Sequence, residues 1–247
     1  MSIDPRYQRL PFDEAVQFLA DKISLPTDTW RDIRDDEHDA FFVVAGAKGS
    51  LLSELREAVE TAIRTGQRIE DFQQIFERIA QGWEYNGSAG WRSRIILQTN
   101  MRASYGRGRE ERQLDPEVLR LQPYLRYVHG GATNPRPHHL ALDGQVFTAD
   151  TMPWSTPNGY GCTCKYVSLS SRRLEQLGLQ PSTLRRGDTL PNGAVMEPDP
   201  GWDRPPRIAR GERRQQSIQN VIDRSPPEIA RQIRADVNRY SEENING

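Results

Sequence analysis

The sequence has little cysteine and almost no lysine. Its 247 residues contain two cysteines, Cys162 and Cys164, and three lysines, Lys22, Lys48 and Lys165. A bridge between cysteines only two positions apart would be strained, which argues against a disulfide-stapled extracellular scaffold and favours a reducing cytoplasm. Because arginine supplies nearly all of the positive charge, most basic groups are guanidinium forks suited to pairing with carboxylate or phosphate.

Long apolar runs are also missing. No stretch approaches the roughly 18 to 20 apolar residues that cross a bilayer, and the first residues are charged without an apolar signal segment. We therefore expect a soluble protein that is not secreted and has no membrane partner. The length allows one large domain or two modest ones, and the strongly negative mean hydropathy indicates segments outside a packed core.

Familiar catalytic motifs are absent as well. The sequence contains no His-Glu-x-x-His helix, Gly-rich phosphate loop, Gly-x-Ser-x-Gly elbow or spaced carboxylate cluster. A cysteine nucleophile with His139 as its base is conceivable, but two residues of the right type carry little weight. We expect a protein that is not an enzyme.

Helical spacing of apolar residues dominates the first half of the chain. It predicts helices at 11–23, from His38, at 51–65 before Gly66, at 69–81 before Gly82, and at 91–112. We expect an N-terminal arm with a short helix at 1–37 and a helical domain at 38–123. The part before residue 91 is predicted to be all helical.

The texture changes after Pro123. Short extended segments broken by glycine and proline predict a small α+β unit at 124–180, with a hairpin signal at Asp143-Gly144. Residues 181–247 read as an extended linker followed by two amphipathic helices, interrupted at Pro226-Pro227, that order against a partner. The predicted class is thus α+β and mainly α-helical: a helical N-terminal part, a small mixed unit and an extended C-terminal tail.

A run of arginines accompanies the long helix at 91–112. These side chains are predicted to bind DNA or a partner: Arg92, Arg94, Arg102, Arg107 and Arg109. The alternative is that they form a solvated helix face, which is the commoner role of such a flank.

Histidine and cysteine gather in the mixed unit. His139, Cys162 and Cys164 offer one nitrogen and two sulfurs, which are ligands that zinc prefers, and His138, Asp143 or His129 would supply a fourth. The alternative is that the cysteines are small buried side chains and the histidines hydrogen-bond a compact loop. Zinc is the only cofactor that the residues indicate, and a metal-dependent nuclease is the enzymatic alternative.

The order of these motifs resembles one family. The segments are HDAFFVVA at 38–45, QTNMRASYGRGR at 98–109, RPHH at 136–139, LDGQVF at 142–147 and PNGYGCTC at 157–164. Together they resemble the phage Mu protein F-like minor head proteins, also called the MuF or head morphogenesis family, over about residues 38–180. Many relatives carry cysteines where this chain has Arg136 and His139.

This resemblance implies a minor capsid protein of a tailed phage. Such a protein binds the portal and the inner shell, with portal, major capsid or scaffold protein and possibly double-stranded phage DNA as partners. It would assist head assembly and genome packaging or ejection, in the host cytoplasm during assembly and later inside the capsid of the virion. A DNA-binding protein is the alternative to this role. The residues expected to hold the fold motif together are Arg136, Asp143, Gly144, Asn158 and Gly159, beside the three metal-ligand candidates.

Overall fold

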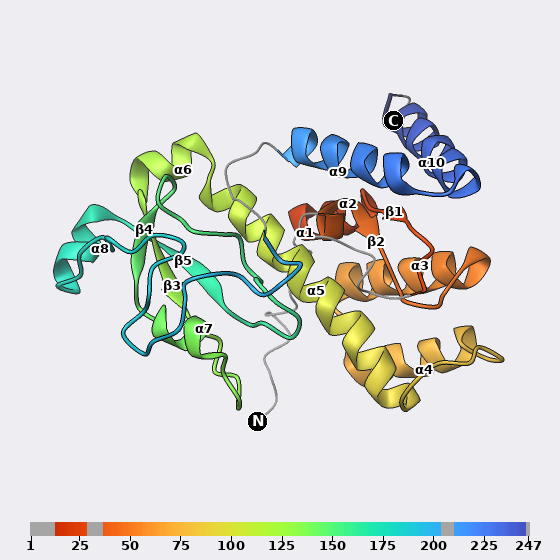
Figure 1. Cartoon of the computed structure of the whole chain (residues 1–247), viewed down its shortest axis with the longest axis horizontal. Helices are drawn as coiled ribbons and strands as arrows, with labels where there is room; N and C mark the ends of the chain where they lie inside the picture. Colours follow the sequence, from red (N-terminus) through yellow and green to blue (C-terminus); the bar gives the residue numbers. More distant parts are fainter. Residues whose placement is uncertain (1–12, 29–36, 204–209, 246–247) are drawn as a thin grey trace. The chain divides into compact units, whose positions relative to one another are not determined.

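The computed structural model describes residues 13–28, 37–203 and 210–245 (Figure 1). Contacts group the chain into two compact units. Unit 1 comprises Met1–Tyr105 together with Arg210–Gly247, and unit 2 comprises Gly106–Ala209. Ten helices and five short strands lie in the described residues, which confirms a mainly α-helical α+β fold.

Unit 1 is built mostly from helices. In chain order its elements are α1 (Asp13–Ala20), β1 (Ile23–Ser24), α2 (Glu37–Ala40), β2 (Phe41–Phe42), α3 (Gly49–Thr65), α4 (Ile69–Ile79), the first part of α5 (Ala89–Gln113), α9 (Arg210–Arg224) and α10 (Pro227–Ile245). The predicted long helices at 51–65, 69–81 and 91–112 are confirmed. The predicted 11–23 helix is present as the shorter α1, and its first residues lie outside the described ones.

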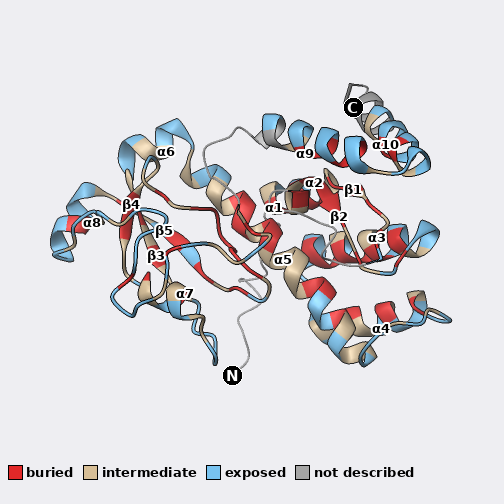
Figure 2. Cartoon of the chain, viewed as in Figure 1, coloured by how far each residue is buried: buried red, intermediate tan, exposed pale blue. Residues whose placement is uncertain are grey.

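Regular spacing of apolar residues explains the helices of unit 1. In α3, Leu52, Leu55, Val59 and Ile63 recur on one face and are buried (Figure 2). Gly66 ends this helix in the left-handed conformation, with φ of 66°, and its N–H donates to the Ala62 carbonyl. The predicted glycine cap is therefore confirmed.

One prediction for the first third of the chain is wrong. Residues 1–91 are not all helical, because β1 and β2 pair in parallel, with Ile23 opposite Phe41. Each strand has only two residues, too short to show the alternation that predicts a strand. The C-terminal helices pack against this pair: Ile218, Val221 and Ile233 share one buried cluster with Ile23 and Phe41.

The C-terminal helices thus bury their apolar faces within unit 1. The predicted break at Pro226-Pro227 is confirmed, since α9 ends at Arg224 and α10 begins at Pro227. Proline is suited to this first helical position, where no intrahelical N–H is needed. An ion pair between Arg224 of α9 and Glu37 of α2 joins the two ends of the sequence, with Nη2 and Oε2 2.6 Å apart.

Unit 2 is built around a three-stranded antiparallel sheet. Its elements are the end of α5, α6 (Pro116–Leu121), β3 (Tyr124–Val128), α7 (Pro137–Ala141), β4 (Val146–Thr148), β5 (Lys165–Leu169) and α8 (Ser171–Gln176). The strand order is β4-β3-β5. The predicted mixed character and the short helix near Leu174 are confirmed.

The predicted hairpin at Asp143-Gly144 is wrong. Leu142 caps α7 instead of belonging to a strand, so the two residues connect a helix to β4. Gly144 adopts φ of 83°, and its N–H donates to the Tyr127 carbonyl at 2.9 Å. The turn signal was correct, but β4 pairs with β3, which lies on the other side of α7 in the chain.

Residues 181–203 cover the sheet with little regular structure. Leu190, Met196 and Trp202 are buried, and the first two join the core of unit 2 around Trp154 and Phe147. The contacts therefore place this predicted linker in unit 2 and the two helices that follow it in unit 1. The predicted segment boundaries at 37, 123 and 180 do not coincide with the two units, because α5 crosses from one unit to the other.

Candidate functional site

His139 is held in the interior by the short helix α7. Pro137 occupies the first turn of that helix, where a missing N–H costs nothing, and the Leu140 N–H bonds back to the Arg136 carbonyl at 3.0 Å. One turn of helix therefore aims His139 into the unit, where it is only 2% exposed.

The two cysteines lie at the end of a tight loop that leads into β5. The Cys162 N–H donates to the Gly159 carbonyl at 3.1 Å, and Gly161 adopts φ of 72°. Glycine at position 159 lets the loop lie close to Asp199, because a Cβ there would lie 2.0 Å from Asp199 Oδ2. The glycines of the PNGYGCTC segment thus let the loop fold tightly enough to bring both sulfurs inward.

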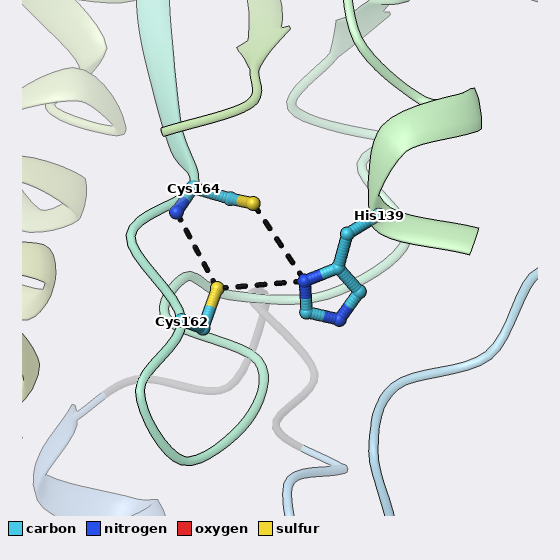
Figure 3. A group of neighbouring side chains, drawn as sticks. All are labelled: His139, Cys162 and Cys164. Atoms are coloured by element: carbon cyan, nitrogen blue, oxygen red, sulfur yellow. Dashed lines mark hydrogen bonds between the residues drawn. The ribbon is translucent and has the colours of Figure 1, made fainter. Parts of the chain in front are cut away.

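The three side chains converge on one point (Figure 3). Nδ1 of His139 lies 3.7 Å from Cys162 Sγ and 3.6 Å from Cys164 Sγ. The backbone N–H of Cys164 also donates to Cys162 Sγ at 3.4 Å. The predicted ligand candidates from two distant segments therefore lie together in the interior of unit 2.

The other ring nitrogen of His139 faces two polar side chains. Nε2 lies 3.1 Å from the Asn158 amide nitrogen and 3.6 Å from Asp199 Oδ1. Asp199 also meets Arg136 Nε at 2.7 Å and His138 Nε2 at 3.3 Å. This carboxylate thus gathers three basic groups on the far side of the His139 ring.

The surroundings shift the pKa of both partners. Burial opposes the charge on His139, but hydrogen bonds to Asp199 and Cys164 outweigh it and raise the His139 pKa. Burial likewise opposes the charge on Asp199, while the His139 hydrogen bond and the Arg136 charge lower its pKa. The arrangement therefore favours a negative Asp199 beside a polarised His139.

The pKa values of the two thiols shift in opposite directions. Hydrogen bonding with Cys162 lowers the pKa of the Cys164 thiol, and the His139 hydrogen bond adds to this effect against the cost of burial. The same pairing with Cys164, together with burial, raises the pKa of Cys162. Negative charge on one of two adjacent sulfurs opposes ionisation of the other.

The residues predicted to hold the fold motif surround this cluster. Arg136 also donates to the Tyr160 carbonyl at 2.7 Å, so it ties α7 to the cysteine loop. Asn158 contacts both His139 and Cys162, its Oδ1 lying 3.2 Å from the sulfur. Asp143 and Gly144 act elsewhere, at the β3–β4 connection.

None of the three predicted fourth ligands joins the two sulfurs and Nδ1. Asp143 accepts the backbone N–H of His129 at 2.8 Å, and His138 is directed to Asp199 instead. Among the described residues, the groups that fit a metal are His139 with both cysteines, and His138, His139 and Asp199. Sequence reasoning missed Asp199, which lies in a segment without periodicity.

The predicted arginine surface is not one continuous face. Arg107 is buried and pairs with Glu110 at 2.8 Å, and Arg92 donates to the Ala45 carbonyl at 2.6 Å. Burial lowers the pKa of Arg109, whereas Arg94 is exposed. At least two of the five guanidinium groups therefore serve packing, and DNA binding through them stays a prediction.

The cluster has the residue types that activate a thiol nucleophile, but its sulfurs are not accessible to a substrate. A cysteine beside a histidine whose other nitrogen meets an amide is an arrangement that activates a thiolate. Cys162 and Cys164 are, however, only 4% and 7% exposed. A substrate would reach neither sulfur without rearrangement, so the geometry fits binding of a small ion better than attack on a substrate.

Comparisons with known proteins identify one family model and two relatives that this chain resembles over different shares of its length. A family model described as phage Mu protein F like protein matches residues 53–167. Over 99% of its length the chain is 29% identical to "Putative capsid assembly protein F" of Escherichia phage Mu, of which it covers 65%. It is 32% identical to the "Mu-like prophage FluMu F protein" of Haemophilus influenzae, over 62% of the chain and 41% of that protein.

The chain thus spans less than two thirds of the length of these curated relatives. No solved structure matches it significantly. None of the described helices is long and apolar enough to cross a membrane.

Proposed function

We propose that the chain, which is similar to the phage Mu protein F-like proteins, is a minor head protein that takes part in capsid assembly of a tailed phage. The observation that carries this proposal is the alignment with the capsid assembly protein of phage Mu, which extends over 99% of the chain. It therefore includes both units, and the role is proposed for the two together.

In the finer proposal, the protein binds the portal and the inner shell of the procapsid and assists genome packaging or ejection. Its partners are the portal protein and either the major capsid or the scaffold protein, and its place is the capsid interior. The role is one of binding, without catalysis. The near absence of accessible sulfur at the cysteine cluster supports a non-enzymatic role for that cluster.

Co-expression tests the finer proposal directly. Tagged chain is produced with portal protein alone, with major capsid protein alone, and with neither, and complexes are recovered by size and by tag. We expect the chain to co-purify with portal protein at a fixed ratio. Recovery with major capsid protein but not portal would contradict portal binding, and recovery with neither would contradict the proposal as a whole.

A further inference from the structure

We infer that His139 Nδ1, Cys162 Sγ and Cys164 Sγ bind a structural zinc ion inside unit 2. The inference goes beyond the proposed role in capsid assembly and does not depend on it. Zinc holds sulfur at about 2.3 Å and nitrogen at about 2.0 to 2.1 Å in a tetrahedron, which separates the two ligand atoms by roughly 3.6 Å. The observed separations from Nδ1 to the sulfurs are 3.6 and 3.7 Å.

The sulfur side of the cluster is arranged for a cation. Both thiols are buried, and the Cys164 N–H donates to Cys162 Sγ at 3.4 Å. Two buried thiolates side by side would repel each other, and a divalent cation between them removes that cost. The ligand atoms therefore have the spacing that zinc requires, and zinc would stabilise both sulfurs as thiolates.

The histidine side supplies the support that zinc ligands usually have. A metal-bound imidazole commonly donates its other N–H to a carboxylate, which fixes the tautomer and turns the free lone pair toward the metal. Asp199 Oδ1 lies 3.6 Å from His139 Nε2 and is the acceptor that faces an N–H on that nitrogen. With the proton on Nε2, the Nδ1 lone pair faces the two sulfurs.

An oxygen donor completes the set of four. Tyr127 of β3 is fully buried, and its hydroxyl has no hydrogen-bond partner among the described residues. Its side chain belongs to the same buried cluster as Cys162 and Cys164. We assign the fourth position to this hydroxyl.

Zinc at this point would connect parts of unit 2 that few regular elements join. Its ligands would come from β3, from α7 and from the cysteine loop, and Asp199 brings in the segment at 181–203 through His139. Because His139 and the two cysteines are almost completely buried, the ion would stabilise the fold instead of activating a substrate.

The first test is the metal content of the full chain. The protein is purified without chelator and without a metal-affinity step, its metals are measured by mass spectrometry, and its zinc environment by X-ray absorption. We expect equimolar zinc with two sulfur neighbours at about 2.3 Å. Metal-free protein, a different metal, or a Cys162–Cys164 disulfide would each overturn the assignment.

Variants then identify the ligands. Cys162→Ser, Cys164→Ser and His139→Ala are expected to lose zinc, whereas His129→Ala keeps it, because His129 lies outside the group. Full zinc retention by the three ligand variants would overturn the proposal. If those variants do not fold, Co²⁺ is loaded into the unaltered chain. Absorption from cobalt bound to thiolate is expected, and its absence would count against the proposal.

Two further variants separate the supporting contacts from the ligands. Asp199→Asn is expected to weaken zinc binding about 10- to 100-fold in competition with a chelator, because it removes the carboxylate behind His139. Tyr127→Phe is expected to weaken it as well and to remove one oxygen neighbour from the absorption spectrum. Unchanged affinity in Asp199→Asn would contradict the supporting role, and an unchanged spectrum in Tyr127→Phe would contradict the fourth ligand.

Discussion

The interiors of the two units are held together by different kinds of side-chain contact. Unit 1 buries apolar side chains of helices at regular spacing, and its largest apolar cluster centres on Leu55, Phe72 and Phe76. Unit 2 has short strands and long irregular segments, and its core includes two cysteines beside a buried histidine and asparagine. Where regular elements are short, specific polar contacts hold the segments together.

The difference predicts which substitutions destabilise each unit most. In unit 1 the largest destabilisation should come from removing buried apolar side chains. In unit 2 it should come from separating closely packed segments or from removing a residue of the polar cluster. Hydrogen exchange measured by mass spectrometry assigns each effect to its unit.

The largest effect is expected from truncating the apolar core of unit 1. Phe76 is fully buried and meets the Tyr85 ring edge-on at 5.6 Å between centroids. Phe76→Ala should lower the free energy of unfolding by about 3 to 5 kcal/mol and expose the amides of α3 and α4. Denaturant titration measures the loss. Leu121→Ala, at a position 67% exposed, is the control and should change little.

The next effect tests the ion pair that attaches α9 to α2. Arg224→Met leaves the buried Glu37 carboxylate without its guanidinium and should cost about 3 kcal/mol. Adding Glu37→Gln to the same chain should recover part of that loss, because no unpaired charge remains. A double variant as unstable as the sum of the single ones would show that the pair itself does not act as a unit.

A glycine in unit 2 tests close approach. A Cβ on Gly106 would lie 2.3 Å from the Thr156 carbonyl oxygen and 2.7 Å from Pro157 Cδ. Gly106→Ala should therefore destabilise unit 2 by about 1 to 3 kcal/mol, with faster exchange in the cysteine loop and β5. Stability equal to that of the unaltered chain would mean that the end of α5 does not need this contact.

A glycine in unit 1 provides the smallest effect and the matching contrast. Nothing lies within 4 Å of a Cβ built on Gly66, so only its left-handed backbone resists a side chain. Gly66→Ala should cost about 1 kcal/mol, with exchange faster only at the end of α3. If Gly66→Ala lost more free energy of unfolding than Gly106→Ala, backbone strain would outweigh steric contact, which contradicts the proposed contrast.

More of the structure of unit 1 than of unit 2 could be predicted from the sequence. The apolar repeat of α3 and the Gly66 cap are local signals, so the helix follows directly from neighbouring residues. The parallel pair β1–β2 was missed because two residues carry no repeat, and the register depends on Phe41 meeting Ile23 across the chain.

For the site, the sequence indicated His139, Cys162 and Cys164 because their residue types stand out within two short motifs. Asp199 was missed because it acts from 60 positions beyond His139, in a segment with many turn residues and no pattern. Arg107 was predicted to face a partner, but Glu110 and Ser155 enclose it, and such packing is not visible from composition.

The most direct test of the proposed function is the protein composition of purified virions and DNA-free procapsids of the source phage. Quantitative mass spectrometry relates the copy number of the chain to that of the major capsid protein. A minor head protein is expected in both particles at low stoichiometry. Absence from both would contradict the proposed role in the head.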